Sequence, residues 1–154
     1  MTSNSRLPPV EVRVAQRFRA SAERVFNAWV DPGTAGRWLF ATALRPMSRV
    51  SIDARAGGAF HFEGRRDGKS VVYAGHYIEI VRPRRLAFTV SCGQCADEVA
   101  RVRVEIVPLA AGCDLRLVQE NVPPDDADRI GGRWDGMLYG LAAMLDRRAA
   151  RRAA

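Results

Sequence analysis

Apolar and polar residues alternate along most of the chain, the pattern of β-strands with one buried and one wet face. Residues 10–19 (VEVRVAQRFR) place Val10, Val12 and Val14 on one side. From residue 48 to 121 similar stretches follow one another, separated by turn signals at Gly57-Gly58, Asp67-Gly68, Pro83, residues 92–95 and Ala111-Gly112. Strands joined by such short turns pair antiparallel, because a parallel pairing needs a long crossover.

Three segments have a helical period instead. Ser21 can cap a helix whose apolar residues follow the i, i+3, i+4 spacing, namely Ala22, Val25, Phe26, Trp29 and Val30. Pro32 and Gly33 end this helix, and residues 34–40 suffice for a short second piece that presents Trp38 and Phe40. Acidic residues after Pro123-Pro124 suit a helix N-terminus, so we predict a long helix from there to about Arg148.

This order of elements predicts an α+β domain, in which the long C-terminal helix covers the apolar face of an antiparallel sheet. With 154 residues and 47% hydrophobic content, the chain is sized for one domain. We predict that domain over residues 10–148, with flexible termini at 1–9 and 149–154. No secretory leader and no stretch as long as a membrane span is visible, so we expect a cytoplasmic protein without a membrane span.

The chain is basic, with a formal net charge of +7, and Lys69 is the only lysine among its 24 basic residues. The arginines are spread along the predicted strands, apart from a C-terminal cluster of Arg147, Arg148, Arg151 and Arg152. Cations suit the negative pole of a helix dipole, so we interpret the cluster as a solvated helix end. Without clustered charge beside groove-reading elements, we predict no nucleic-acid partner.

Two of the three cysteines form a Cys-Gly-Gln-Cys motif at residues 92–95. A redox motif of this spacing usually places its first thiol at a helix N-terminus, whereas both flanks here are predicted strands. A tetrahedral zinc site would need two further ligands. We therefore favour an incidental hairpin connection, with Gly93 in the turn, over a redox or metal site.

Sequence templates for catalysis are absent, since the chain has no G-x-S-x-G, no glycine-rich phosphate loop and no H-E-x-x-H. The paired carboxylates Asp125 and Asp126 follow two prolines at a predicted helix start, where capping explains them. We therefore assign no catalytic residue, no metal and no cofactor, and an enzyme is the less favoured interpretation.

Two stretches resemble a known family. The first is ASAERVFNAWVDPGTAGRW at residues 20–38, and the second is GHYIEIVRPRRLAFTV at residues 75–90. Together with Gly57-Gly58 and a tryptophan-bearing last helix, they resemble the family named for the activator of the heat-shock protein 90 ATPase. That family belongs to the START-like superfamily, which includes the birch-pollen allergen and polyketide cyclases. Family members often carry Gly directly before the Trp of the last helix, whereas here Arg133 stands between Gly132 and Trp134.

The resemblance implies a helix-grip fold, in which a curved antiparallel sheet of about six or seven strands wraps the long C-terminal helix around a cavity. Relatives bind lipids, steroids or polyketides, cyclise polyketides, or assist the chaperone. Our first hypothesis is therefore binding of a small hydrophobic or amphipathic ligand, and the second is a chaperone-interacting module. A cyclase or aromatase is the third, favoured if His76 or Glu79 lies buried beside Tyr77 with a perturbed pKa. Unpaired sheet edges also leave a homodimer open.

The predicted last helix carries glycine at 132, 136 and 140, although each interior glycine costs a helix about 0.5–1 kcal/mol relative to alanine. The three form a smooth edge beside the apolar stripe of the helix. We interpret this edge, together with Met137 and Met144, as a cavity rim or a close packing seam. The alternative is that the glycines face solvent and only weaken the helix.

The residues predicted to line the cavity are the large apolar side chains that should face inward: Trp38, Phe60, Phe62, Tyr73, Tyr77, Phe88, Trp134, Met137, Leu138 and Leu141. We expect most of these to be ordinary core residues. Ligand pockets add a few polar groups that orient the ligand. We expect Gln119, on the face of Leu117, and His76, on the face of Ile78 and Ile80, to supply them, whereas His61 should face water.

Overall fold

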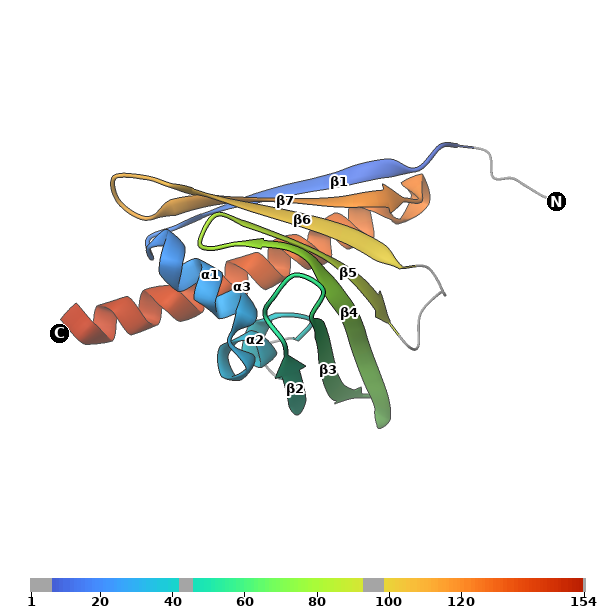
Figure 1. The fold of residues 1–154 in the computed structure, drawn as a ribbon, viewed down its shortest axis with the longest axis horizontal. Helices are drawn as coiled ribbons and strands as arrows, with labels where there is room; N and C mark the ends of the chain where they lie inside the picture. The colour runs from blue at the N-terminus through green and yellow to red at the C-terminus, as the bar shows by residue number, and fades with distance from the viewer. Residues whose placement is uncertain (1–6, 42–45, 93–98, 154) are drawn as a thin grey trace.

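The computed structural model describes residues 7–41, 46–92 and 99–153, and its elements follow the predicted order (Figure 1). They are β1 (Val10–Phe18), α1 (Ala22–Val30), α2 (Pro32–Trp38), β2 (Arg49–Ile52), β3 (Ala59–Arg66), β4 (Lys69–Val81), β5 (Arg85–Cys92), β6 (Ala100–Pro108), β7 (Cys113–Val122), the short 3-10 helix η1 (Pro124–Asp126) and α3 (Ala127–Ala153). The long last helix is confirmed, and it continues past its predicted end at Arg148.

The seven strands form one antiparallel sheet in the order β1-β7-β6-β5-β4-β3-β2. From β2 to β7 each strand pairs with the next one in the chain, while β1 pairs with β7. Figure 1 shows the sheet curving along one side of α3, with α1 and α2 beside that helix. The predicted α+β helix-grip fold is confirmed.

Capping side chains decide where the two short helices begin. The Ser21 hydroxyl accepts a hydrogen bond from a backbone amide of the first turn of α1 at 3.2 Å. Asp31 ends α1 and also caps α2, because its carboxylate accepts a hydrogen bond from the Thr34 amide at 3.0 Å. The second helix therefore begins at Pro32 rather than at residue 34. Proline suits this position because it has no backbone N–H, and an N–H in the first helical turn would have no partner within the helix.

The core lies between α3 and the inner face of the sheet. Leu138 and Leu141 of α3 are completely buried, and Trp134 and Leu145 nearly so. Aromatic rings from β3, β4, β5 and the two short helices fill the middle of the sheet's concave side. Among the described residues, no polar or charged residue is fully buried. The burial of apolar surface is therefore the main stabilising contribution to the fold.

Some predictions reach beyond what the structure describes. Gly93 and Cys95 of the Cys-Gly-Gln-Cys motif lie outside the described residues, as do the side chains of the C-terminal arginine cluster. The flanks of the motif, β5 and β6, pair antiparallel as predicted. The domain limits at 10 and 148 and the flexible termini stay predictions. Within the described part of the chain, no helix is long and apolar enough to cross a membrane.

Candidate functional site

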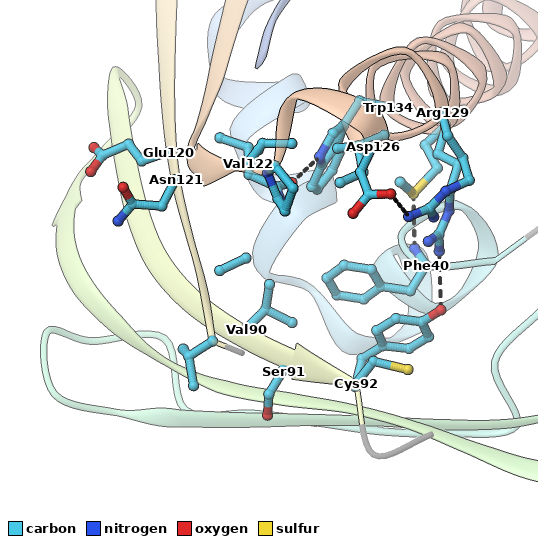
Figure 2. A pocket seen from close by; sticks show the side chains of 18 residues that line it. Phe40, Val90, Ser91, Cys92, Glu120, Asn121, Val122, Asp126, Arg129 and Trp134 are labelled. Atoms are coloured by element: carbon cyan, nitrogen blue, oxygen red, sulfur yellow. Dashed lines mark hydrogen bonds and ion pairs between the residues drawn. The ribbon is translucent and has the colours of Figure 1, made fainter. Parts of the chain in front are cut away.

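A hollow of about 230 Å³ opens between the first turns of α3 and the ends of β5, β6 and β7 (Figure 2). We call it the Trp134 cavity. Apolar side chains make up the larger part of its described lining, and seven of the eighteen lining residues are polar or charged. The lining residues are Phe40, Tyr73, Val90, Ser91, Cys92, Val99, Ala100, Gln119, Glu120, Asn121, Val122, Pro123, Asp126, Arg129, Ile130, Arg133, Trp134 and Met137.

Two hydrogen bonds between side chains hold the walls of the Trp134 cavity. The indole Nε1–H of Trp134 donates to Oε1 of Gln119 at 2.8 Å, and Nη2 of Arg133 donates to the Tyr73 hydroxyl at 3.0 Å. Gln119 therefore lines the cavity, as predicted, and satisfies an indole N–H that burial would otherwise leave unpaired. Its amide nitrogen makes no hydrogen bond within the described residues, so it is free to donate to a ligand.

Phe40 is a central lining residue that the sequence prediction left out of the cavity. It follows α2 with a φ of 60°, in the left-handed region that favours glycine. Its ring stacks on Tyr73 with centroids 4.6 Å apart and planes 7° from parallel. Its backbone N–H donates to the sulfur of Met137 at 3.2 Å. The only signal in the sequence was its place two residues after Trp38.

Charged side chains stand at the rim of the Trp134 cavity. Asp126, predicted to cap the last helix, lies in η1 and pairs with Arg129 at 3.3 Å. Glu120 is held by Arg103 of the neighbouring strand at 2.8 Å. Exposed pairs of this kind contribute only about 0–1 kcal/mol to stability. They therefore shape the electrostatics of the rim more than they stabilise the fold.

A second hollow, of about 670 Å³, shares Phe40, Arg133 and Met137 with the first. It runs along Gly132, Gly136 and Gly140, and we call it the glycine groove. Apart from the nearby backbone of α3 itself, a Cβ atom at any of these glycines would meet no atom of the described residues within 4 Å, so the predicted close packing seam is wrong. All three glycines are exposed and border an open groove, which agrees with the predicted cavity rim and equally with the alternative that the glycines face solvent. The remaining described lining residues are Arg37, Trp38, Ala41, Pro46, Arg66 and Met144.

Half of the predicted cavity residues lie in a closed core. Only about 10 Å³ is left among the rings that surround Trp29. The rings of Phe60 and Phe88 lie 5.6 Å apart, and burial raises the pKa of Tyr77 above its usual value. The predicted residues that are buried and line neither the Trp134 cavity nor the glycine groove are Phe60, Phe62, Tyr77, Phe88, Leu138 and Leu141.

Five other predicted residues do reach a hollow. Tyr73, Gln119 and Trp134 line the Trp134 cavity, and Met137 lines both hollows. Trp38 lines the glycine groove, while its indole Nε1–H donates to the carbonyl of Ala28 at 2.9 Å. The sequence also missed much of the apolar wall, including Val90, Val122 and Ile130.

The predicted inward orientation of His76 is wrong. Strand β4 buries Tyr77, so alternation turns His76 to the exposed outer face. Its face is shared with Ile78, which is 39% exposed. A register shift between Tyr77 and Glu79 then changes the phase of the alternation, and Ile80 packs against the core. His76 and Ile80 therefore lie on different faces, which an unbroken period of two could not indicate.

The arrangement that would favour a cyclase is not present among these residues. The Glu79 side chain is 45% exposed and pairs with Arg85 at 3.5 Å, so it is not a buried, desolvated acid. His61 lies on the wetter face of β3, as expected, 3.4 Å from a carboxylate oxygen of Glu63.

The cysteines of the described chain differ in environment. Cys92 is a half-buried free thiol that lines the Trp134 cavity, whereas Cys113 is buried on β7. Burial, and secondarily the charge of Asp114, raises the pKa of Cys113 to about 11. Within the described ranges, no group of three or more His, Cys, Asp or Glu side chains could hold a metal ion.

Comparison with solved structures places this geometry among known folds. A protein from Chromobacterium violaceum is 28% identical with a TM-score of 0.78, over 87% of this chain and 95% of that chain. The AHSA1-like protein from Aeromonas hydrophila is 18% identical with a TM-score of 0.79, over 91% and 94%. DynU16, from the dynemicin biosynthetic locus, is 17% identical with a TM-score of 0.72, over 88% of this chain and 47% of that one. The last two likenesses concern the fold alone.

Sequence comparison adds the family. No curated protein matches the chain. The family profile described as Activator of Hsp90 ATPase homolog 1-like protein matches residues 19–146, which is most of the chain and includes both stretches that carry the resemblance. The chain therefore belongs to the family of Activator of Hsp90 ATPase homolog 1-like proteins, with the START-like fold of that family.

Proposed function

We propose that the protein binds a small hydrophobic or amphipathic molecule, such as a lipid, a sterol or a polyketide-like compound, in the Trp134 cavity. The observation that carries this proposal is the make-up of that cavity. An apolar wall that includes Val90, Val122 and Ile130 surrounds the amide of Gln119, which is held in place by Trp134 and still has a nitrogen free to donate. Apolar enclosure supplies affinity, and one oriented polar group supplies specificity.

The position of the cavity supports the proposal. Its walls come from β5, β6, β7 and α3, which are held by the core, so the site needs little reorganisation to accept a ligand. DynU16 comes from a biosynthetic locus, and its similar fold is consistent with a scaffold that handles small molecules. We keep the cytoplasmic location and the homodimer as proposals that rest on the sequence alone.

The test uses the neutral dye Nile red, whose fluorescence rises in an apolar site. Ala100 lines the cavity at the start of β6, and Arg101 next to it is exposed on the opposite face. Ala100→Phe should fill the cavity and abolish saturable dye binding, while Arg101→Phe should bind as the wild type does. Native mass spectrometry of gently purified protein should show a copurified small molecule in the wild type and none in Ala100→Phe. Dye binding that is absent in the wild type, or unchanged in Ala100→Phe, would contradict the proposal.

A second candidate function is interaction with a chaperone of the heat-shock protein 90 class, and the family match is what favours it. Such a function would use an outer surface instead of the Trp134 cavity. It predicts that Ala100→Phe stimulates the ATPase of the host's own chaperone as well as the wild type does. Stimulation by both proteins, with no dye binding by either, would replace the first proposal with this one.

A further inference from the structure

The glycine groove extends the Trp134 cavity on the far side of a thin wall. The side chains of Phe40, Arg133 and Met137 line both hollows. The contacts that close this wall are the sulfur hydrogen bond from Phe40 to Met137, 3.2 Å long, and the bond from Arg133 to Tyr73, 3.0 Å long. The first is a weak bond to a thioether, and the donor of the second is an exposed arginine. A ligand that displaces Arg133 from Tyr73 would reach from one hollow into the other.

The volumes also favour a ligand that uses both hollows. Pockets for drug-sized ligands usually measure about 300–1,000 Å³. The Trp134 cavity, at about 230 Å³, holds only part of such a molecule, while the glycine groove adds about 670 Å³. Gly136 leaves that groove open on the α3 side, because a Cβ there would meet no atom of the described residues within 4 Å beyond the nearby helix backbone.

The charges of the two hollows differ. The Trp134 cavity has both signs at its rim, with Asp126 paired to Arg129. The glycine groove is lined by Arg37, Arg66 and Arg133, and none of its described lining residues is acidic. Within the described chain, Arg37 and Arg66 make no ion pair, as is true of most of the other described arginines, so both guanidinium groups can bind an anion.

Unpaired guanidinium groups beside an apolar hollow fit a particular chemistry. Guanidinium binds carboxylate and phosphate oxygens through two parallel N–H···O bonds, and it is weakly hydrated, so it loses little on leaving water. A neutral ligand would make no use of Arg37 and Arg66. The arrangement therefore selects a molecule with an apolar end and an anionic end.

We propose that the ligand is an anionic amphiphile, whose apolar end occupies the Trp134 cavity and whose carboxylate or phosphate lies in the glycine groove against Arg37 and Arg66. This inference rests on the proposed function and deepens it, since it names the chemical class of the ligand and the direction in which it lies.

The experiment compares three compounds with the same alkyl chain, dodecanoate, dodecyl phosphate and dodecan-1-ol, as competitors of Nile red. The variant is Arg37→Gln/Arg66→Gln, and the matched control is Arg101→Gln on the outer face of the sheet. Loss of the two cations should weaken the binding of at least one anionic compound by about tenfold and leave the binding of dodecan-1-ol unchanged. The control should behave as the wild type does. Whichever anion weakens more identifies the head group.

A second measurement separates binding from folding. A higher salt concentration should weaken the binding of the anionic competitor to the wild type, because salt screens exposed charges. Its effect on binding to the double variant should be much smaller. Both proteins should melt at the same temperature. If the double variant binds all three compounds as the wild type does, the inference is wrong while the proposed function stands. If Nile red binds the wild type but no compound displaces it, the inference is also wrong and the proposed function stands, whereas if Nile red does not bind at all, both are wrong.

Discussion

The interface between α3 and the sheet is closed at one place and open at another. In the middle of the sheet, rings around Phe88 leave a hollow of about 10 Å³. Near the start of α3, the same helix and the same sheet leave about 230 Å³ beside Trp134. The difference lies in what the short helices contribute, because Trp29 of α1 and Leu39 after α2 fill the closed region. The alternation of apolar and polar residues along the strands therefore identifies the inner face of the sheet, but it does not indicate where a cavity remains on that face.

The largest effect is expected from a substitution in the closed region. Phe88→Ala removes a ring that is 2% exposed and contacts Trp29, Phe60 and Tyr77. It should cost about 3–5 kcal/mol in the free energy of unfolding. Met137→Ala, beside the open hollows, should cost about 1 kcal/mol, since its side chain is only partly buried. Urea denaturation measures both changes, provided that the dependence of the unfolding free energy on urea concentration is the same in the wild type and the variants. Equal losses in the free energy of unfolding would mean that the two regions are packed alike.

What the sequence could predict follows from the range over which its signals act. Strand alternation, the cap at Ser21 and the antiparallel order all depend on neighbours in the chain, and these predictions are confirmed. The inward direction of Gln119 also follows from simple alternation along β7, where Leu115 and Leu117 are buried. Such local patterns predicted the order of the elements and the α+β layout, whereas the helix-grip fold followed from the family resemblance and the pairing of β1 with β7 was not predicted.

The errors arose where a tertiary feature interrupts the local pattern. The register shift after Tyr77 changes the phase of β4, so Ile80 packs against the core, whereas His76 faces out because it alternates with the buried Tyr77. The positive φ of Phe40 turns its ring into the wall of the cavity, which no helix period or strand period indicates. Whether Phe60 lines a cavity or a filled core depends on rings from other elements, and packing of that kind has no signal within one segment.

A smaller loss of stability is expected from a substitution in the wall of the open Trp134 cavity. Gln119→Leu should leave the Trp134 indole N–H without a partner and cost about 1–3 kcal/mol. Combined with Trp134→Phe, which removes the donor, the loss should fall short of the sum by about 1 kcal/mol. Gln16→Leu on β1, which removes a hydrogen bond to an adjacent exposed carbonyl, is the control and should change stability by less than about 0.5 kcal/mol. Strict additivity would mean that the Gln119 bond does not hold the cavity wall.

Glycine substitutions should change stability in opposite directions in the two regions. Gly136→Ala should stabilise the fold by about 0.5–1 kcal/mol, because α3 gains helix propensity and the new Cβ meets only open space. Gly75→Ala should destabilise it, because its Cβ would collide with the carbonyl oxygen of Thr89 beside the packed ring of Phe60. Thermal melting followed by circular dichroism measures both, and destabilisation by Gly136→Ala would mean that the groove is closed in solution.

The smallest perturbation is a thiol label, which measures the accessibility of each cysteine side chain without a substitution in the core. The thiolate is the reactive form, and a pKa of about 11 leaves Cys113 almost entirely protonated near neutral pH. In a Cys95→Ser protein, a maleimide should therefore modify Cys92 at the Trp134 cavity and spare Cys113. The Cys113 rate should rise as the pH approaches that pKa, since the thiolate fraction grows about tenfold for each unit. Peptide mass spectrometry assigns the label. A competitor that occupies the cavity should slow only Cys92, and equal labelling of both thiols at neutral pH would show that the closed region opens as readily as the cavity does.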